Sequence, residues 1–104
     1  MTILLTALLA LPAYAQDAEA GKATYTANCM ACHGASGGGD GPAAIALSPQ
    51  PKSFSDAAFW EGKTDEVLKT TIKAGKPGTA MSGFSQLSDA DVKNLIAYMK
   101  TFKP

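Results

Sequence analysis

The pentapeptide Cys29-Met30-Ala31-Cys32-His33 is the feature that most constrains what this chain can fold into. Two cysteine thiols three positions apart can add across the two vinyl groups on one edge of a porphyrin and form thioethers. A histidine directly after the second cysteine then falls beneath the ring, where its imidazole can bind the iron. The spacing therefore predicts one haem c, attached covalently through Cys29 and Cys32, with His33 as an axial ligand of the iron.

Other interpretations of the two cysteines need features that this sequence lacks. A thioredoxin-like redox dithiol belongs near a βαβ pattern, and the sequence has no strand-rich region. A structural zinc site takes four Cys or His ligands, whereas this chain has two Cys and one His. A plain disulfide would leave His33 without a role. We therefore expect haem attachment, and the redox dithiol is the main alternative.

The first fifteen residues predict a secretory signal peptide. Residues 3–11 are almost wholly apolar, and an A-x-A cleavage signal ends at Ala15. A bilayer span needs about 17 to 25 apolar residues, and polar Gln16 ends this stretch too early. The segment before residue 3 contains no Lys or Arg, so a truncated or misplaced start and an uncleaved anchor are alternatives. We expect a signal peptide over residues 1–15, a single monohaem domain over residues 16–104, and export to the periplasm.

Size and charge narrow the choice of partner. Removal of the signal peptide would leave 89 residues (104 minus 15), and so small a domain often needs a cofactor to complete its core. Nine Lys balance nine Asp plus Glu, and the nine Lys account for every basic residue except the histidine. A neutral chain without a basic run predicts neither nucleic acid nor an anionic membrane surface as its partner, and we expect no membrane span after cleavage.

Three segments carry the signals of helices. Residues 17–29 have helical spacing of Gly21 and Tyr25 on one face. Thr64 is a predicted N-cap for a helix that ends before Gly75, with Val67, Leu68 and Ile72 as its apolar side. Ser88 and Asp91 form a predicted capping box that opens the last helix.

Two irregular segments separate these helices, at residues 34–41 and 77–85, and both are rich in glycine. No segment shows the alternating pattern of a strand. Long loops in so small a domain predict a wrapped ligand. The expected fold is therefore all-α, with about three to five short helices and long loops around one covalently attached haem.

Together these elements resemble the class I cytochromes c, in particular the small bacterial periplasmic members. The haem motif stands near the end of the first helix, as in that family. Pro77-Gly-Thr-Ala-Met81 with Phe84 resembles the family's methionine loop. The resemblance also includes a contact between the first and last helices, here predicted for Gly21 and Tyr25 against Leu95 and Tyr98.

The resemblance implies further haem contacts. It suggests that the backbone carbonyl of Pro42 accepts a hydrogen bond from the second ring nitrogen of His33. It also suggests that the Thr79 hydroxyl donates to a haem propionate. By position, the Trp60 indole is a second candidate donor to a propionate, although Trp60 and Phe59 are most simply core residues.

The second axial ligand is expected to be Met81. Met30 lies between the attachment cysteines, too close to the proximal edge to reach over the ring. Met99 has core spacing on the last helix, where methionine usually only packs. Met81 stands in a loop bounded by Pro77 and Gly83, which can bring its thioether over the distal face.

Coordination by His33 and Met81 would fill both axial positions and leave a single-electron carrier rather than an enzyme. The expected partners are periplasmic or membrane-bound redox proteins, with the chain acting as a monomer or as a small subunit of a redox complex. Two alternatives stay open: a peroxidase-like or gas-reactive haem protein, with Asp40 or a lysine as its acid–base group, and an electron-transfer subunit of a dehydrogenase. The lysines near Met81, which are Lys63, Lys69, Lys73 and Lys76, are expected to form a mixed-charge surface.

Overall fold

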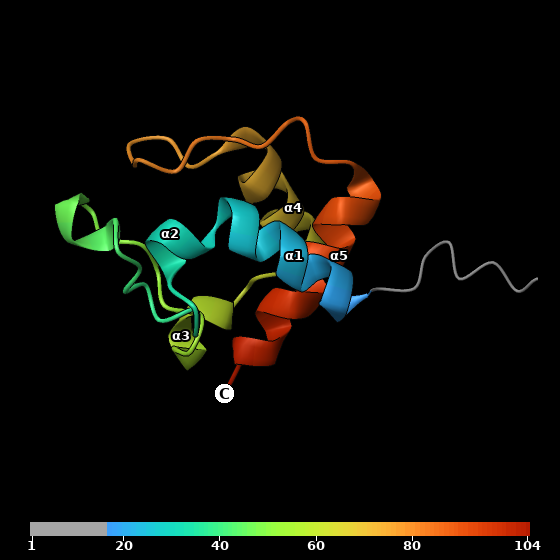
Figure 1. Cartoon of the computed structure of the whole chain (residues 1–104), viewed down its shortest axis with the longest axis horizontal. Helices are drawn as coiled ribbons and strands as arrows, with labels where there is room; N and C mark the ends of the chain where they lie inside the picture. The colour runs from blue at the N-terminus through green and yellow to red at the C-terminus, as the bar shows by residue number, and fades with distance from the viewer. Residues whose placement is uncertain (1–16) are drawn as a thin grey trace, which may run out of the picture.

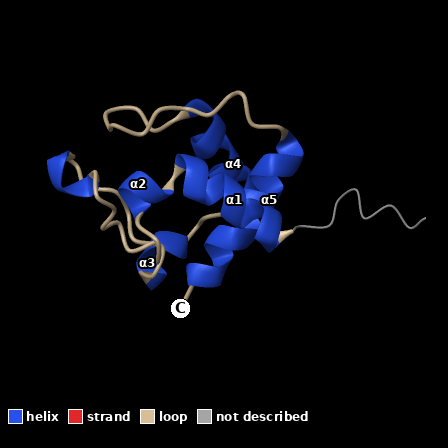
Figure 2. Ribbon diagram, in the orientation of Figure 1, coloured by secondary structure: helices blue, strands red, loops and turns tan. Residues whose placement is uncertain are grey.

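The computed structural model describes residues 17–104 and shows an all-helical fold over that range (Figures 1 and 2). The signal peptide predicted for residues 1–15 lies outside the described residues. The one β-pairing recorded in the described part is an isolated bridge between Gly75 and Ser82. The elements in chain order are α1 (Ala18–Asn28), α2 (Met30–His33), the 3-10 turn η1 (Ala44–Ala46), α3 (Ala57–Trp60), α4 (Asp65–Ala74), α5 (Asp89–Met99) and the 3-10 turn η2 (Lys100–Phe102). The predicted all-α class is confirmed.

The first predicted helix is present, and it leads directly into the haem motif. The Asp17 carboxylate caps α1 by accepting hydrogen bonds from the backbone N–H groups of Glu19 and Ala20. The helix ends at Asn28, and α2 begins two residues later. Cys29 therefore stands at the junction of the two helices.

The two other predicted helices have the caps expected from the sequence. The Thr64 hydroxyl accepts from the Val67 N–H at 3.2 Å, at the start of α4. Ser88 Oγ accepts from the Asp91 N–H at 3.0 Å, and the Asp91 carboxylate accepts from the Ser88 N–H at 3.3 Å. This reciprocal capping box satisfies two backbone donors that a helix start leaves unpaired.

Helices α1 and α5 cross at backbone contact, and Figure 1 shows them side by side. A Cβ atom on Gly21 would collide with the carbonyl oxygen of Asn94, so only glycine permits this approach. The rings of Tyr25 and Tyr98 lie 5.2 Å apart beside the crossing. The predicted contact between the first and last helices is confirmed.

Ion pairs at the surface connect α4 with α5 and with η2. The Asp89 carboxylate lies 3.0 Å from the Lys73 ammonium and 3.4 Å from that of Lys69. Hydrogen bonds from the two lysines, with the one from Lys73 as the larger cause, hold the pKa of the Asp89 carboxyl below its usual value. Lys100 lies 2.8 Å from Asp65. Such exposed pairs contribute little stability, and they show that lysines of α4 belong to a surface of mixed charge.

Helix α3 was not predicted. Its four residues are too few to give a periodic signal, and its start is set by Asp56, whose carboxylate accepts from the Ala58 N–H at 3.0 Å. Trp60 at its end is buried in the core, as expected. None of the helices described between residues 17 and 104 has the length and apolarity required to cross a membrane.

Replacement of Gly21 by alanine tests the close helix crossing. Although alanine favours helices more than glycine does, we expect Gly21→Ala to lower the free energy of unfolding by about 1–3 kcal/mol, the usual cost of overpacking. The measurement is denaturant unfolding of the haem-loaded protein. Lys22→Ala, at an exposed position of the same helix, is the control and should unfold like wild type. A Gly21→Ala protein at least as stable as wild type would contradict the backbone contact.

Candidate haem-binding site

A cavity of about 510 Å³ brings together most of the predicted site residues. Cys29, Cys32 and His33 line it on one side, and Met81 and Thr79 line it from the loop between α4 and α5. This volume lies within the range of about 300–1,000 Å³ that is typical of small-molecule and cofactor sites. The remaining walls are largely apolar and include Tyr25, Phe54, Leu68, Ile72, Leu95 and Met99.

Two of the predicted residues do not reach the cavity. Pro42 is exposed and Trp60 is buried, and neither contributes to the lining. Val67, on the predicted apolar side of its helix, is 44% exposed. It lines the cavity instead, so its apolar side chain belongs to the site.

The attachment cysteines lie on one tight turn of chain. The backbone N–H groups of Cys32 and His33 both donate to the Cys29 carbonyl, at 3.2 and 2.9 Å. Both cysteines are half-buried free thiols, not joined in a disulfide. Burial, and then the neighbouring Cys32, raises the pKa of the Cys29 thiol to about 11. Both sulfur atoms are therefore uncommitted and available on the cavity wall.

The imidazole of His33 is oriented for a metal. Its Nδ1 lies 3.2 Å from the backbone carbonyl oxygen of Lys52. Because a carbonyl only accepts, Nδ1 carries the proton in this contact and Nε2 keeps its lone pair. Burial lowers the pKa of His33 and outweighs the opposite effect of this hydrogen bond, so the ring is held neutral.

The carbonyl partner of His33 is therefore Lys52 rather than the predicted Pro42. The backbone on either side of Pro42 is hydrogen-bonded to α2. The Gly41 N–H donates to the Cys32 carbonyl at 3.0 Å, and the Ala43 N–H donates to the Ala31 carbonyl at 2.9 Å. The position that the resemblance suggested for Pro42 is taken by a segment ten residues further along the chain.

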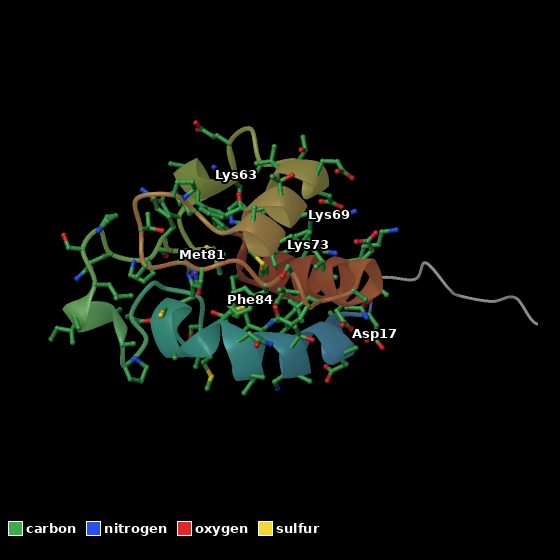
Figure 3. All side chains as sticks on the ribbon, turned by 90° about the horizontal axis from the view of Figure 1, so that it is seen from above. Asp17, Lys63, Lys69, Lys73, Met81 and Phe84 are labelled. Atoms are coloured by element: carbon green, nitrogen blue, oxygen red, sulfur yellow. The ribbon has the colours of Figure 1, made fainter. Side chains whose placement is uncertain are left out.

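Met81, labelled in Figure 3, is held by a small hydrogen-bond network within the loop that joins α4 to α5. Its carbonyl accepts from the Lys76 N–H at 3.1 Å, and its N–H donates to the Thr79 hydroxyl at 3.2 Å. Thr79 in turn donates to the Lys76 carbonyl at 2.7 Å. In this structure the Thr79 hydroxyl thus bonds within the loop and positions the backbone of Met81, and its predicted hydrogen bond to a propionate stays a prediction.

Both ends of this loop are fixed against α4. The Phe84 N–H donates to the Ile72 carbonyl at 2.9 Å. A Cβ atom on Gly83 would collide with the Lys73 carbonyl, and one on Gly75 would lie 2.8 Å from the Met81 carbonyl oxygen. Glycine at both positions therefore allows the backbone to close beneath Met81.

The Trp60 indole has a backbone partner in the core. Its N–H is buried and donates to the Phe54 carbonyl at 2.8 Å. An indole has a single donor, which this bond occupies here, and the predicted bond to a propionate stays a prediction. The sequence-based prediction missed Lys52 and Phe54, because a backbone carbonyl and a lone phenylalanine carry no local signal of their role.

Charged groups at the cavity are lysines. Lys52, Lys63 and Lys76 contribute to its lining and are exposed. Lys63 also places its ammonium 5.1 Å from the centre of the Phe59 ring. Asp40, the acidic alternative for acid–base chemistry, does not line the cavity. A neutral imidazole, two free thiols, a loop thioether and apolar walls fit a covalently attached haem.

Comparison with known proteins identifies the family of this chain. The family model described as cytochrome c matches residues 18–103. The chain belongs to the cytochrome c family. It is 36% identical over 95 residues to cytochrome c-555 of Chlorobaculum tepidum, an alignment that covers 84% of this chain and 78% of that protein.

Two further relatives are larger. The chain is 40% identical over 99 residues to a dihydro-heme d1 dehydrogenase of Pseudomonas aeruginosa, which covers 92% of this chain and 18% of that protein. It superposes on a chain of the Kuenenia stuttgartiensis reducing HAO-like protein complex with a TM-score of 0.72 and 29% identity, over 82% of this chain and 42% of that chain. This cytochrome is accordingly an electron carrier with the class I fold and one covalently bound haem c.

The hydroxyl of Thr79 can be tested separately from the haem. Thr79→Val removes one acceptor and one donor beside Met81, so the backbone amide of Met81 should exchange with solvent about five- to tenfold faster in native-state hydrogen exchange. A hydrogen bond contributes about 1 kcal/mol, and 1.4 kcal/mol corresponds to a factor of ten. Thr70→Val is the control, because the Thr70 hydroxyl donates to Glu66 within α4. Unchanged exchange in Thr79→Val would contradict the positioning role.

Proposed function

We propose that this cytochrome is an exported carrier whose iron is coordinated by His33 and Met81, with no axial position open to a substrate. The observation that supports this most is their common cavity: His33 lines it from α2, and Met81 lines it from a loop 48 residues later in the chain (81 minus 33). The His33 ring is also fixed by a hydrogen bond at Nδ1, and the Met81 backbone is fixed by hydrogen bonds at its N–H and carbonyl groups.

The two donors suit electron transfer. The haem, when bound, supplies a one-electron Fe(III)/Fe(II) couple. The Met81 thioether is a soft and weak donor, which favours the reduced state and raises the reduction potential relative to a second histidine. Because His33 is tied to Lys52 and Met81 to Thr79 and Lys76, neither donor needs to move when the charge changes.

The residues around the cavity do not favour a peroxidase-like function. The sole histidine of the chain is His33, which the proposal uses on the proximal side. Asp40 does not line the cavity, so the acid–base group of such an enzyme would have to be one of the exposed lysines.

The expected partners are redox proteins on the outer side of the cytoplasmic membrane, consistent with the signal peptide predicted for residues 1–15. A second candidate function, an electron-transfer module within a larger dehydrogenase, is favoured by the relative named dihydro-heme d1 dehydrogenase, of which this sequence matches 18%. Co-purification of the exported chain would separate the two: a free carrier elutes alone, and a module elutes with a larger subunit.

Carbon monoxide binding to the reduced, haem-loaded protein tests the Met81 ligand. We expect Met81→Leu to bind carbon monoxide rapidly at neutral pH, because leucine has no donor atom, whereas wild type should not respond. The oxidised Met81→Leu protein should also lose the methionine–iron charge-transfer band. Exchange of methionine for leucine conserves volume and costs less than about 1.5 kcal/mol, so the variant should fold.

Met99→Leu is the matched control, because Met99 is buried and lines the same cavity. It should keep the charge-transfer band and stay closed to carbon monoxide. If Met99→Leu opens the site and Met81→Leu does not, the ligand assignment is wrong. Rapid binding by the wild type would overturn the closed-site proposal as a whole.

A further inference from the structure

The face of the His33 imidazole is covered by Phe54. The two ring centres lie 4.5 Å apart, and the ring planes differ by 20°, so the rings are stacked. Phe54 is 4% exposed, which leaves its ring little room to turn away. Stacking of this kind favours one orientation of the imidazole plane over the others.

Phe54 is itself fixed by hydrogen bonds to both of its backbone groups. Its N–H donates to the Gly37 carbonyl at 2.6 Å, in the glycine-rich loop that follows the haem motif. Its carbonyl accepts the buried indole N–H of Trp60 at 2.8 Å. The phenyl ring is also packed by Phe59 at 4.9 Å and by Trp60 at 6.4 Å between ring centres. The position of Phe54 is therefore set independently of His33.

The same stretch of chain contacts the imidazole in a second direction. The Lys52 carbonyl, two residues before Phe54, lies 3.2 Å from Nδ1 at the edge of the ring. This single hydrogen bond fixes the edge of the ring but leaves rotation about the N···O axis open. Rotation about that bond would carry the imidazole off the Phe54 ring, so the edge contact and the face contact together define one orientation.

We propose that Phe54 is a positioning residue for the axial histidine: its stacked ring, anchored by Trp60, sets the orientation of the His33 imidazole plane and shields it from water. The proposal rests on the proposed function only in taking His33 as the proximal ligand. It does not depend on the identity of the distal ligand. The orientation of an axial imidazole, and water near it, affect the electronic structure and the potential of the iron.

The test compares three variants of the haem-loaded protein. Phe54→Leu removes the stacked ring. Phe102→Leu is the matched control, because Phe102 is partly buried against Tyr25 and does not line the cavity. Trp60→Phe keeps an apolar ring at position 60 but removes the hydrogen bond that anchors the Phe54 carbonyl. The readouts are the haem methyl resonances of the oxidised protein, its electron paramagnetic resonance spectrum, the midpoint potential and the melting temperature.

We expect Phe54→Leu to shift the pattern of haem methyl resonances and the paramagnetic spectrum, and to lower the midpoint potential as water gains access to His33. Trp60→Phe should shift both spectra in the same direction by a smaller amount. Phe102→Leu should lower the melting temperature and leave both spectra as in wild type. Phe54→Tyr, which keeps an aromatic ring, should restore most of the wild-type pattern.

A purely structural role for Phe54 has a different signature. In that case Phe54→Leu melts earlier, as Phe102→Leu does, while its spectra and potential remain those of wild type, and the inference is overturned. If Phe54→Leu does not fold, Trp60→Phe decides: a wild-type pattern there overturns the inference. Carbon monoxide binding by the wild type would overturn the proposed Met81 ligation and leave these spectral comparisons valid.

Discussion

The close crossing of α1 and α5 is the constraint on which the site depends. Gly21 allows the two backbones to touch, and the helices then define two walls of the cavity. Helix α1 ends beside Cys29, so the crossing places the attachment turn. Helix α5 contributes Leu95 and Met99 to the cavity lining and packs against α4. The loop that bears Met81 is fixed in turn to the end of α4.

The two proposed axial donors are supported in different ways. His33 has no partner within its own turn for its side chain, and it depends on Lys52 and Phe54 from a segment that returns about twenty residues later. Met81 is held by hydrogen bonds within five residues of itself, through Thr79 and Lys76. The proximal side is thus sensitive to packing far along the chain, whereas the distal loop is largely self-contained.

The difference between local contacts and contacts far along the chain explains which features could be predicted from the sequence. Features set by local chemistry, such as the capping box at Ser88 and the glycine at the helix crossing, were predictable because the residues themselves carry the signal. For His33, Trp60 and Thr79, this structure shows the carbonyls of Lys52, Phe54 and Lys76 as partners; Lys52 takes the place predicted for Pro42, and the two contacts to haem propionates stay predictions. Each depends on how an irregular loop folds back, and any carbonyl of a returning chain can accept such a bond.

The central claim is that Met81 is bonded to the iron opposite His33, and the position of its methyl group tests this most directly. In the reduced protein, a methyl group held above a haem lies in the ring current of the porphyrin. With methyl-labelled methionine, the account predicts that the resonance of Met81 moves far upfield, while Met30 and Met99 appear near ordinary methionine positions. An ordinary resonance for Met81, or a strongly shifted one for Met99, would contradict it.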